Sequence, residues 1–145
     1  MRAKALILLL VATSIASCKD DGPKVATFNL CVHPNGTVFV PGTTGAQCTP
    51  TQTLQRGQST TLLIDADLYS GEPRTATISI PFGLPTGWTG TLGGTTIDIP
   101  GQTTLTITVP QNAASGDYPL VVRAVSGNEE VLLRFDVRLA GGNPI

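Results

Sequence analysis

Asp65 and Asp67 are the residues whose type and spacing come nearest to a chemical site. They lie two positions apart in a segment that alternates apolar and polar residues, so on a strand both carboxylates point to one face. With Glu72 or Asp98 they would offer the oxygen ligands that Ca²⁺ prefers, and paired carboxylates also perform glycoside hydrolysis. Acids on the solvent-facing side of a strand need neither role. We keep Asp65 and Asp67 as metal candidates but expect no bound cofactor and no catalytic residue.

The single histidine does not complete a catalytic set. A triad would need a nucleophile beside His33, and no Gly-x-Ser-x-Gly motif is present. His33 precedes Pro34 and the turn residues Asn35 and Gly36, so we expect it in a solvent-exposed loop.

The first 17 residues have the layout of a secretory leader. Arg2 and Lys4 form a basic start, and Ala5 to Ala12 is an unbroken apolar run. That run is far shorter than the roughly 20 residues of a membrane-spanning helix, which favours the apolar region of a signal peptide over an anchor helix that stays in place.

The end of this leader carries a reactive thiol. Ile15-Ala16-Ser17-Cys18 resembles the lipobox of bacterial lipoproteins, in which a branched apolar residue and two small residues precede the modified cysteine. The resemblance implies cleavage between Ser17 and Cys18 and a diacylglyceryl thioether on Cys18, often with an added N-acyl chain such as palmitate. Two or three acyl chains anchor a protein stably. We therefore expect a lipid-anchored, extracytoplasmic protein of the cell membrane or, with slight preference, the outer membrane, with residues 18–24 as a lipidated tether.

Cys31 and Cys48 remain once Cys18 is lipidated. In an oxidising compartment an even pair of cysteines is most simply a disulfide. It would hold in place a segment rich in Gly, Pro and Thr between the two positions. The alternative is a metal site that also uses His33, but two cysteines and one histidine at loose spacing fall short of the usual four ligands.

The rest of the chain predicts short strands. Charged residues make up 13% of the chain, with 16 glycines and 11 prolines, and such a composition favours strands and turns over helices. Apolar residues recur with a period of two. The predicted strands are Val25 to Val32, Val38 to Val40, Ser59 to Tyr69, Thr75 to Ile80, Thr95 to Ile99, Thr103 to Val109, Tyr118 to Val125 and Glu130 to Leu139.

These seven or eight strands predict an all-β fold, an antiparallel immunoglobulin-like β-sandwich over residues 25–139. Its first part, residues 25–50, would contain the disulfide, and residues 140–145 would form a tail. The last two strands flank Gly127-Asn128 and predict a hairpin.

The stretch from Gln55 to Leu139 resembles a known family. Leu84-Pro85-Thr86-Gly87-Trp88 followed by Ala114-Ser115-Gly116-Asp117-Tyr118 is similar to the order of turns in bacterial and archaeal surface Ig-like domains of the NPCBM-associated family. This sequence has Ala114-Ser115 where that pattern usually has a proline before the glycine. The family implies a fold and an extracellular accessory role.

Aromatic residues are the remaining candidates for ligand binding. Trp88 and Tyr69, with Tyr118, would suit a carbohydrate-stacking face. The family resemblance instead implies that Trp88 and Tyr118 pack against the sandwich, which leaves Tyr69 as the exposed ring.

The charge of the chain helps to exclude some classes of function. The net charge is −1 without clustered lysine or arginine, which argues against nucleic-acid binding. We expect a non-enzymatic interaction or structural module that is attached to the membrane and contacts an envelope protein, polysaccharide or another copy of itself. The alternatives are a carbohydrate-binding accessory module and, less favoured, a hydrolase with a dispersed active site.

Overall fold

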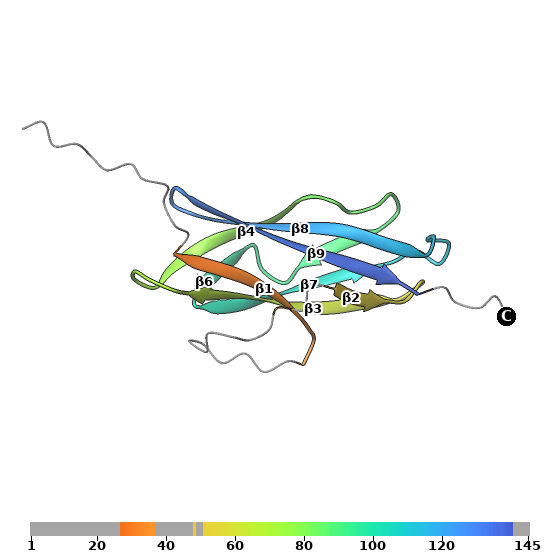
Figure 1. The fold of residues 1–145 in the computed structure, drawn as a ribbon, viewed down its shortest axis with the longest axis horizontal. Helices are drawn as coiled ribbons and strands as arrows, with labels where there is room; N and C mark the ends of the chain where they lie inside the picture. Colours follow the sequence, from red (N-terminus) through yellow and green to blue (C-terminus); the bar gives the residue numbers. More distant parts are fainter. Residues whose placement is uncertain (1–26, 37–47, 49–50, 141–145) are drawn as a thin grey trace, which may run out of the picture.

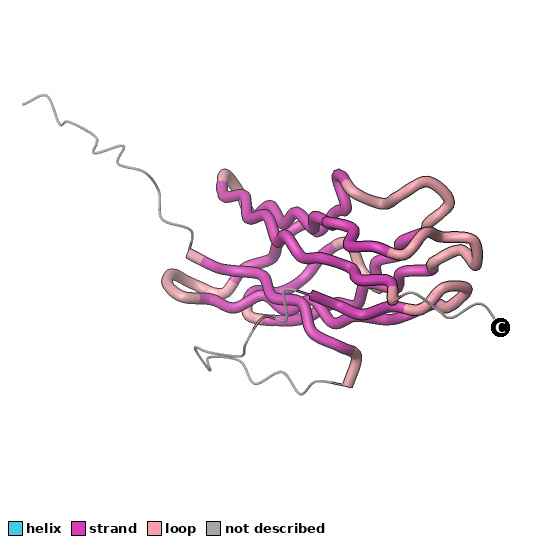
Figure 2. Tube along the Cα trace, turned by 45° about the vertical axis from the view of Figure 1, so that its right-hand side comes forward, coloured by secondary structure: helices cyan, strands magenta, loops and turns pink. Residues whose placement is uncertain are grey.

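The protein is a sandwich of two β-sheets. The computed structural model describes residues 27–36, 48 and 51–140, which form nine strands and no helix (Figures 1 and 2). The all-β prediction is confirmed, although the strands number nine rather than seven or eight. Within the described ranges, no helix is long and apolar enough to cross a membrane.

Each sheet contains strands from both halves of the chain. One sheet has the order β1-β3-β7-β5 and the other the order β2-β9-β8-β4-β6. The strands are β1 (Phe28–Pro34), β2 (Thr51–Leu54), β3 (Ser59–Leu68), β4 (Arg74–Phe82), β5 (Thr89–Leu92), β6 (Thr96–Ile99), β7 (Gly101–Thr108), β8 (Gly116–Ser126) and β9 (Glu129–Leu139).

The strands with clear alternation lie close to where the sequence predicts them. The predicted closing hairpin is also present: β8 and β9 pair from Gly116 opposite Leu139 to Ser126 opposite Glu129. Its turn uses Gly127 at a φ of 60°, a conformation that glycine adopts without strain. β2 and β5 were not predicted, because each has only four residues, is rich in threonine and shows too little alternation of apolar and polar residues. The strand expected at Val38 to Val40 lies outside the described residues.

The N-terminal part of the described chain contributes one strand to each sheet. β1 pairs antiparallel with β3, from Phe28 opposite Leu68 to Pro34 opposite Leu62. β2 pairs with β9 in the other sheet, and this pairing is parallel. The chain therefore changes sheets between β1 and β2, which places both strands at the same side of the sandwich.

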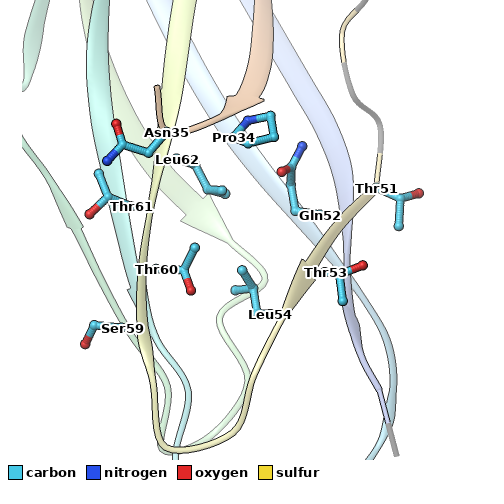
Figure 3. A pocket seen from close by; sticks show the side chains of 10 residues that line it. All are labelled: Pro34, Asn35, Thr51, Gln52, Thr53, Leu54, Ser59, Thr60, Thr61 and Leu62. Atoms are coloured by element: carbon cyan, nitrogen blue, oxygen red, sulfur yellow. The ribbon is translucent and has the colours of Figure 1, made fainter. Parts of the chain in front are cut away.

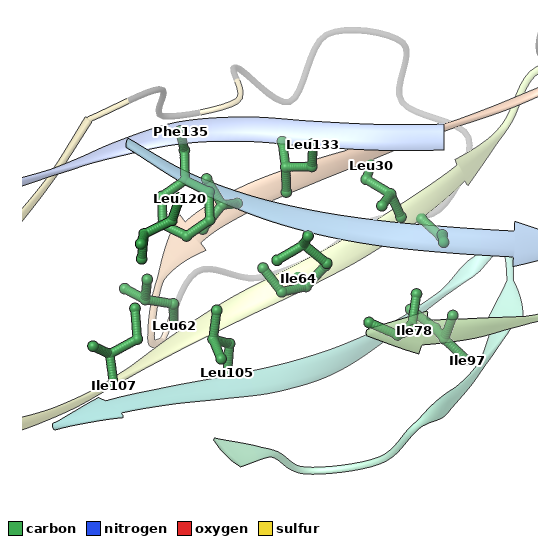
Figure 4. Close-up of a cluster of buried hydrophobic side chains, with 14 of the residues drawn as sticks. Leu30, Leu62, Ile64, Ile78, Ile97, Leu105, Ile107, Leu120, Leu133 and Phe135 are labelled. Carbon is green, nitrogen blue, oxygen red and sulfur yellow. The ribbon is translucent and has the colours of Figure 1, made fainter. Parts of the chain in front are cut away.

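The core lies between the inner faces of the two sheets (Figure 4). Leu30, Ile64 and Leu105 come from one sheet and Leu120 and Phe135 from the other, and each is at most 3% exposed. Every second residue of β9, from Val131 to Leu139, points into this core while its neighbours face solvent. The sandwich is held by this apolar layer.

Trp88 and Tyr118 close one end of the core. Trp88 is 7% exposed, and its ring centroid lies 4.9 Å from that of Tyr118. The Tyr118 hydroxyl donates a hydrogen bond of 2.8 Å to the carbonyl oxygen of Ala114. Both rings thus pack as expected, and Trp88 is too deeply buried to belong to a ligand-binding surface.

A polar bridge fastens the start of β1 to the opposite sheet. The Thr27 hydroxyl donates to Oε2 of Glu129 over 2.7 Å, and Arg74 donates to the same carboxylate. Burial alone would raise the pKa of Glu129, but hydrogen bonds from Thr27 and Arg74 outweigh it and hold that pKa below its ordinary value. The charged state of Glu129 therefore ties β1 to β4 and β9.

Replacing a residue at the centre of the core should destabilise the sandwich. Ile64 is fully buried on β3, and Ile64→Ala should lower the free energy of unfolding by about 2–5 kcal/mol through lost burial and a cavity. Leu132→Ala, on the exposed face of β9, is the control and should change it by at most about 0.5 kcal/mol. Urea denaturation measures both, and equal effects would contradict this location of the core.

Candidate functional site

The structure gathers three chemically active side chains on the outer face of β1 and β3. In the antiparallel register Cys31 lies opposite Asp65, and Asn29 lies opposite Asp67. Because alternate strand residues share a face, Cys31 and His33 point to the same side of β1. One possible ligand atom from each of Cys31, His33 and Asp65 lies within 4.8 Å of those of the other two. We call these three residues the outer-face cluster.

The outer-face cluster is buried, which corrects two predictions. His33 is 5% exposed and belongs to β1, not to a solvent-exposed loop. Asp65 is 0% exposed although it faces away from the core, so it is not the solvent-facing acid that the alternation predicts. Sequence periodicity identified the correct face of β3 but could not show that this face is covered.

His33 and Asp65 form a buried ion-pair contact. Nε2 of His33 lies 2.9 Å from Oδ1 of Asp65. Apart from this contact with His33, neither carboxylate oxygen of Asp65 has a side-chain partner among the described residues. Burial raises the pKa of Asp65, the charge of His33 offsets only part of that rise, and the charge of Asp67 adds to it. The carboxylate is therefore held at an energetic cost.

A disulfide covers the same place. The structure joins Cys31 to Cys48, the pairing expected from the sequence, with 4.9 Å between their Cα atoms. Cys48 is half-buried beside the buried sulfur of Cys31. A cross-link over a separation of 17 residues contributes on the order of 3 kcal/mol in the chain-entropy model. It also brings Cys48 to the outer-face cluster.

Asp65 and Asp67 share one face of β3, but Asp67, Glu72 and Asp98 do not belong to a group of potential metal ligands among the described residues. Asp98 lies on β6, which belongs to the opposite sheet, and Glu72 is exposed between β3 and β4. Among described residues, the group of three or more potential metal ligands is Cys31, His33 and Asp65, and Asp67 is not in it. The signal available in the sequence was the spacing of Cys31 and His33, which on a strand places both on one face.

A second feature is an open groove between β2 and β3 (Figure 3). Its volume is about 680 Å³. Hydroxyl and amide side chains dominate its walls, with Leu54, Leu62 and Pro34 as the apolar part. The described residues that line it are Pro34, Asn35, Thr51, Gln52, Thr53, Leu54, Ser59, Thr60, Thr61 and Leu62. None of these residues has a charged side chain.

The groove exists because β1 ends before β3 does. β1 stops pairing at Pro34, opposite Leu62, while β3 continues back to Ser59. Over Ser59 to Thr61 the described strands pair with β3 only on its β7 side. Among the described strands, β2 pairs with β9. Two strand edges therefore border the groove, and alternate residues of a strand direct their backbone N–H and C=O groups toward such an edge.

The aromatic candidates do not form a flat binding face. Trp88 is buried, as described above. Tyr69 is 57% exposed, as expected, and its hydroxyl accepts a hydrogen bond of 3.3 Å from Asn29. Phe82, which the sequence analysis overlooked, is 71% exposed at the end of β4 in the other sheet. Ser17 and Cys18 lie outside the described residues.

Comparison with known proteins finds similarity in fold only. No protein-family model matches the chain, and no curated protein matches it by sequence. A family 123 glycoside hydrolase from Clostridium perfringens superposes with a TM-score of 0.54 at 13% identity, over 83% of this chain and 28% of the hydrolase.

Two further solved structures are more distantly similar. Domains 4 and 5 of the S-layer protein SbsC match with a TM-score of 0.45 and 16% identity, over 64% of this chain and 49% of that one. A conjugative transposon lipoprotein from Bacteroides eggerthii matches with a TM-score of 0.43 and 15% identity, over 77% and 96%. The chain spans about half of the S-layer fragment and under a third of the hydrolase. The superposition on the hydrolase shows a shared fold and nothing more.

The burial of Asp65 predicts how the free energy of unfolding depends on pH. Its raised native pKa means that its contribution to stability is present below the unfolded pKa, near 4, and is lost as pH rises through the native pKa. Asp65→Asn cannot ionise, so its free energy of unfolding should improve relative to the unmodified protein between pH 4 and pH 7. Urea denaturation at several pH values measures this difference. The exposed Asp98→Asn variant is the control, and parallel curves for Asp65→Asn and the unmodified protein would refute the prediction.

Proposed function

We propose that this protein is a lipid-anchored, extracytoplasmic interaction module of the bacterial cell envelope, non-enzymatic and built on an immunoglobulin-like sandwich. The anchor is supported by the basic and apolar leader ending in Ile15-Ala16-Ser17-Cys18. The disulfide between Cys31 and Cys48 suits an oxidising compartment. The similar structures include a lipoprotein and an S-layer protein by their names. The proposed location does not rest on them.

The groove between β2 and β3 is the observation on which the binding role rests. The described residues of its walls offer hydroxyl, amide and backbone groups, and none of them has an acidic or basic side chain. This inventory suits binding rather than catalysis, which needs a positioned proton donor or acceptor. The pair that has such groups, His33 and Asp65, is almost completely buried and out of reach of a substrate.

We propose an extended polypeptide segment of another envelope protein as the occupant. Two bordering strand edges can extend their hydrogen-bonding ladders onto an added strand, as in β-augmentation. The uncharged lining disfavours a strongly anionic polymer. Carbohydrate binding is less well supported, because the exposed aromatic rings of the described residues are far from forming one face: Tyr69 follows β3, and Phe82 ends β4 in the other sheet.

The lipid anchor is tested by removing its thiol. Cys18→Ala should leave a precursor that keeps its leader, incorporates no fatty acid and migrates above the mature form, because no thioether can form. Labelling with an alkyne-bearing palmitate analogue and intact-protein mass spectrometry measure both effects. The double variant Cys31→Ser with Cys48→Ser is the matched control and should still be lipidated. Unchanged processing of Cys18→Ala would refute the anchor.

The groove is tested by site-specific photocrosslinking in intact cells. A photoreactive phenylalanine analogue at Thr53 or Ser59 should give a discrete crosslinked product that protease removes, because both positions line the groove. The same analogue at Leu132, exposed on β9, is the control and should not give that product. Adding Thr60→Arg should reduce the yield at Thr53 at least fivefold. Equal products at all three positions, or a product resistant to protease, would refute the proposed occupant.

A further inference from the structure

The outer-face cluster has a composition that the sandwich itself does not require. Cys31, His33 and Asp65 are each at most 5% exposed, and their potential ligand atoms lie within 4.8 Å of one another. Cys48 adds a second sulfur, bonded to Cys31. The second sulfur reaches this place through its bond to Cys31, since Cys48 is not one of the three residues whose ligand atoms lie within 4.8 Å of one another.

Asp65 is the residue that points to a ligand. Its side chain is fully buried, and among the described residues only the side chain of His33 contacts its carboxylate oxygens. Leu63, its neighbour on the same face, is buried there at no such cost. A buried carboxylate with so few partners is costly in free energy unless a cation compensates its charge, and His33 supplies only a single contact.

We propose that reduction of the Cys31–Cys48 disulfide converts this cluster into a four-ligand site for one zinc-class divalent cation. The ligands are the sulfurs of Cys31 and Cys48, a ring nitrogen of His33 and a carboxylate oxygen of Asp65. Two thiolates with one nitrogen and one oxygen form the tetrahedral set that suits Zn²⁺. The disulfide and the metal then define two exclusive states of the same residues.

The chemistry of the conversion balances with a dithiol as reductant. The dithiol supplies two electrons and two protons and becomes a disulfide, while the bond between Cys31 and Cys48 breaks and both sulfurs become thiols. Binding the cation releases those two protons to solvent and leaves two thiolates on the metal. The disulfide form lacks the thiolates and therefore lacks the site.

The geometry requires only small movements of the three buried ligands. Bonds of about 2.0–2.3 Å in a tetrahedron place ligand atoms about 3.3–3.8 Å apart. The corresponding atoms of Cys31, His33 and Asp65 already lie within 4.8 Å of one another. β1 and β3 hold them at fixed register through seven paired positions, so the ligand geometry is largely set before the metal binds.

Cobalt is the direct probe of this site. The full-length protein in a Cys18→Ala background, so that only Cys31 and Cys48 are thiols, would be compared oxidised and reduced with a water-soluble phosphine under anaerobic conditions. The reduced form should bind one equivalent of Co²⁺ with tetrahedral d–d bands and a thiolate-to-cobalt charge-transfer band, and Zn²⁺ should displace it. The oxidised form should show neither band.

Single-residue variants test whether His33 and Asp65 bind the metal together with the two cysteines. His33→Ala and Asp65→Asn should each weaken Zn²⁺ binding to the reduced protein at least about tenfold in competition with a chelating dye, since even indirect supports of a metal ligand are worth that much. Asp67→Asn, two residues from Asp65 and outside the cluster, is the matched control and should bind as the parent does.

Three outcomes would overturn the proposal. One is a reduced protein that binds less than half an equivalent of metal. Another is an octahedral cobalt spectrum, or binding that His33→Ala leaves unchanged, which would indicate simple chelation by two thiols. The third concerns folding: circular dichroism of the reduced protein should show that Zn²⁺ raises its thermal midpoint, and a midpoint that does not move would count against a site within the fold.

Discussion

Only one face of each sheet in a sandwich meets the other sheet, so each strand must present its apolar side chains on alternate residues. This constraint determines the register of β1 and β3. Phe28, Leu30 and Val32 enter the core, and Cys31 and His33 must then point outward. A shift of one residue would bury the polar side chains in the core and expose the apolar ones. The packing of the core therefore positions the chemistry on the opposite face.

The outer face of β1 and β3 departs from the usual pattern of a sandwich. On β9 the outward residues are exposed, whereas β3 is buried on both faces from Leu62 to Ala66. A fully buried carboxylate, a buried histidine and a disulfide share this place. Each is costly or chemically reactive when excluded from water. Their concentration on one strand pair separates this region from the rest of the surface, where ion pairs such as that of Arg138 with Asp117 are exposed.

Both proposed sites depend on the way the N-terminal region divides between the sheets. β1 ends at Pro34, and the next described strand, β2, pairs in parallel with β9 in the other sheet. The shortness of β1 leaves the edge of β3 open beside β2, which forms the groove. β1 itself carries Cys31 and His33, so a single short strand supports the outer-face cluster and borders the proposed binding groove.

The sequence by itself determined the fold class, the faces of the long strands and the closing hairpin, because alternation and turn glycines are local signals. It also indicated which cysteines pair, whereas the inward packing of Trp88 was expected only from the family resemblance. Tertiary structure alone decided that Asp65 and His33 are buried, since burial on an outer face depends on what lies across from it, not on neighbours in the chain. It likewise decided that Asp98 lies in the opposite sheet from Asp65, and that β2 and β5 exist, because short threonine-rich strands form only where a neighbouring strand offers an edge.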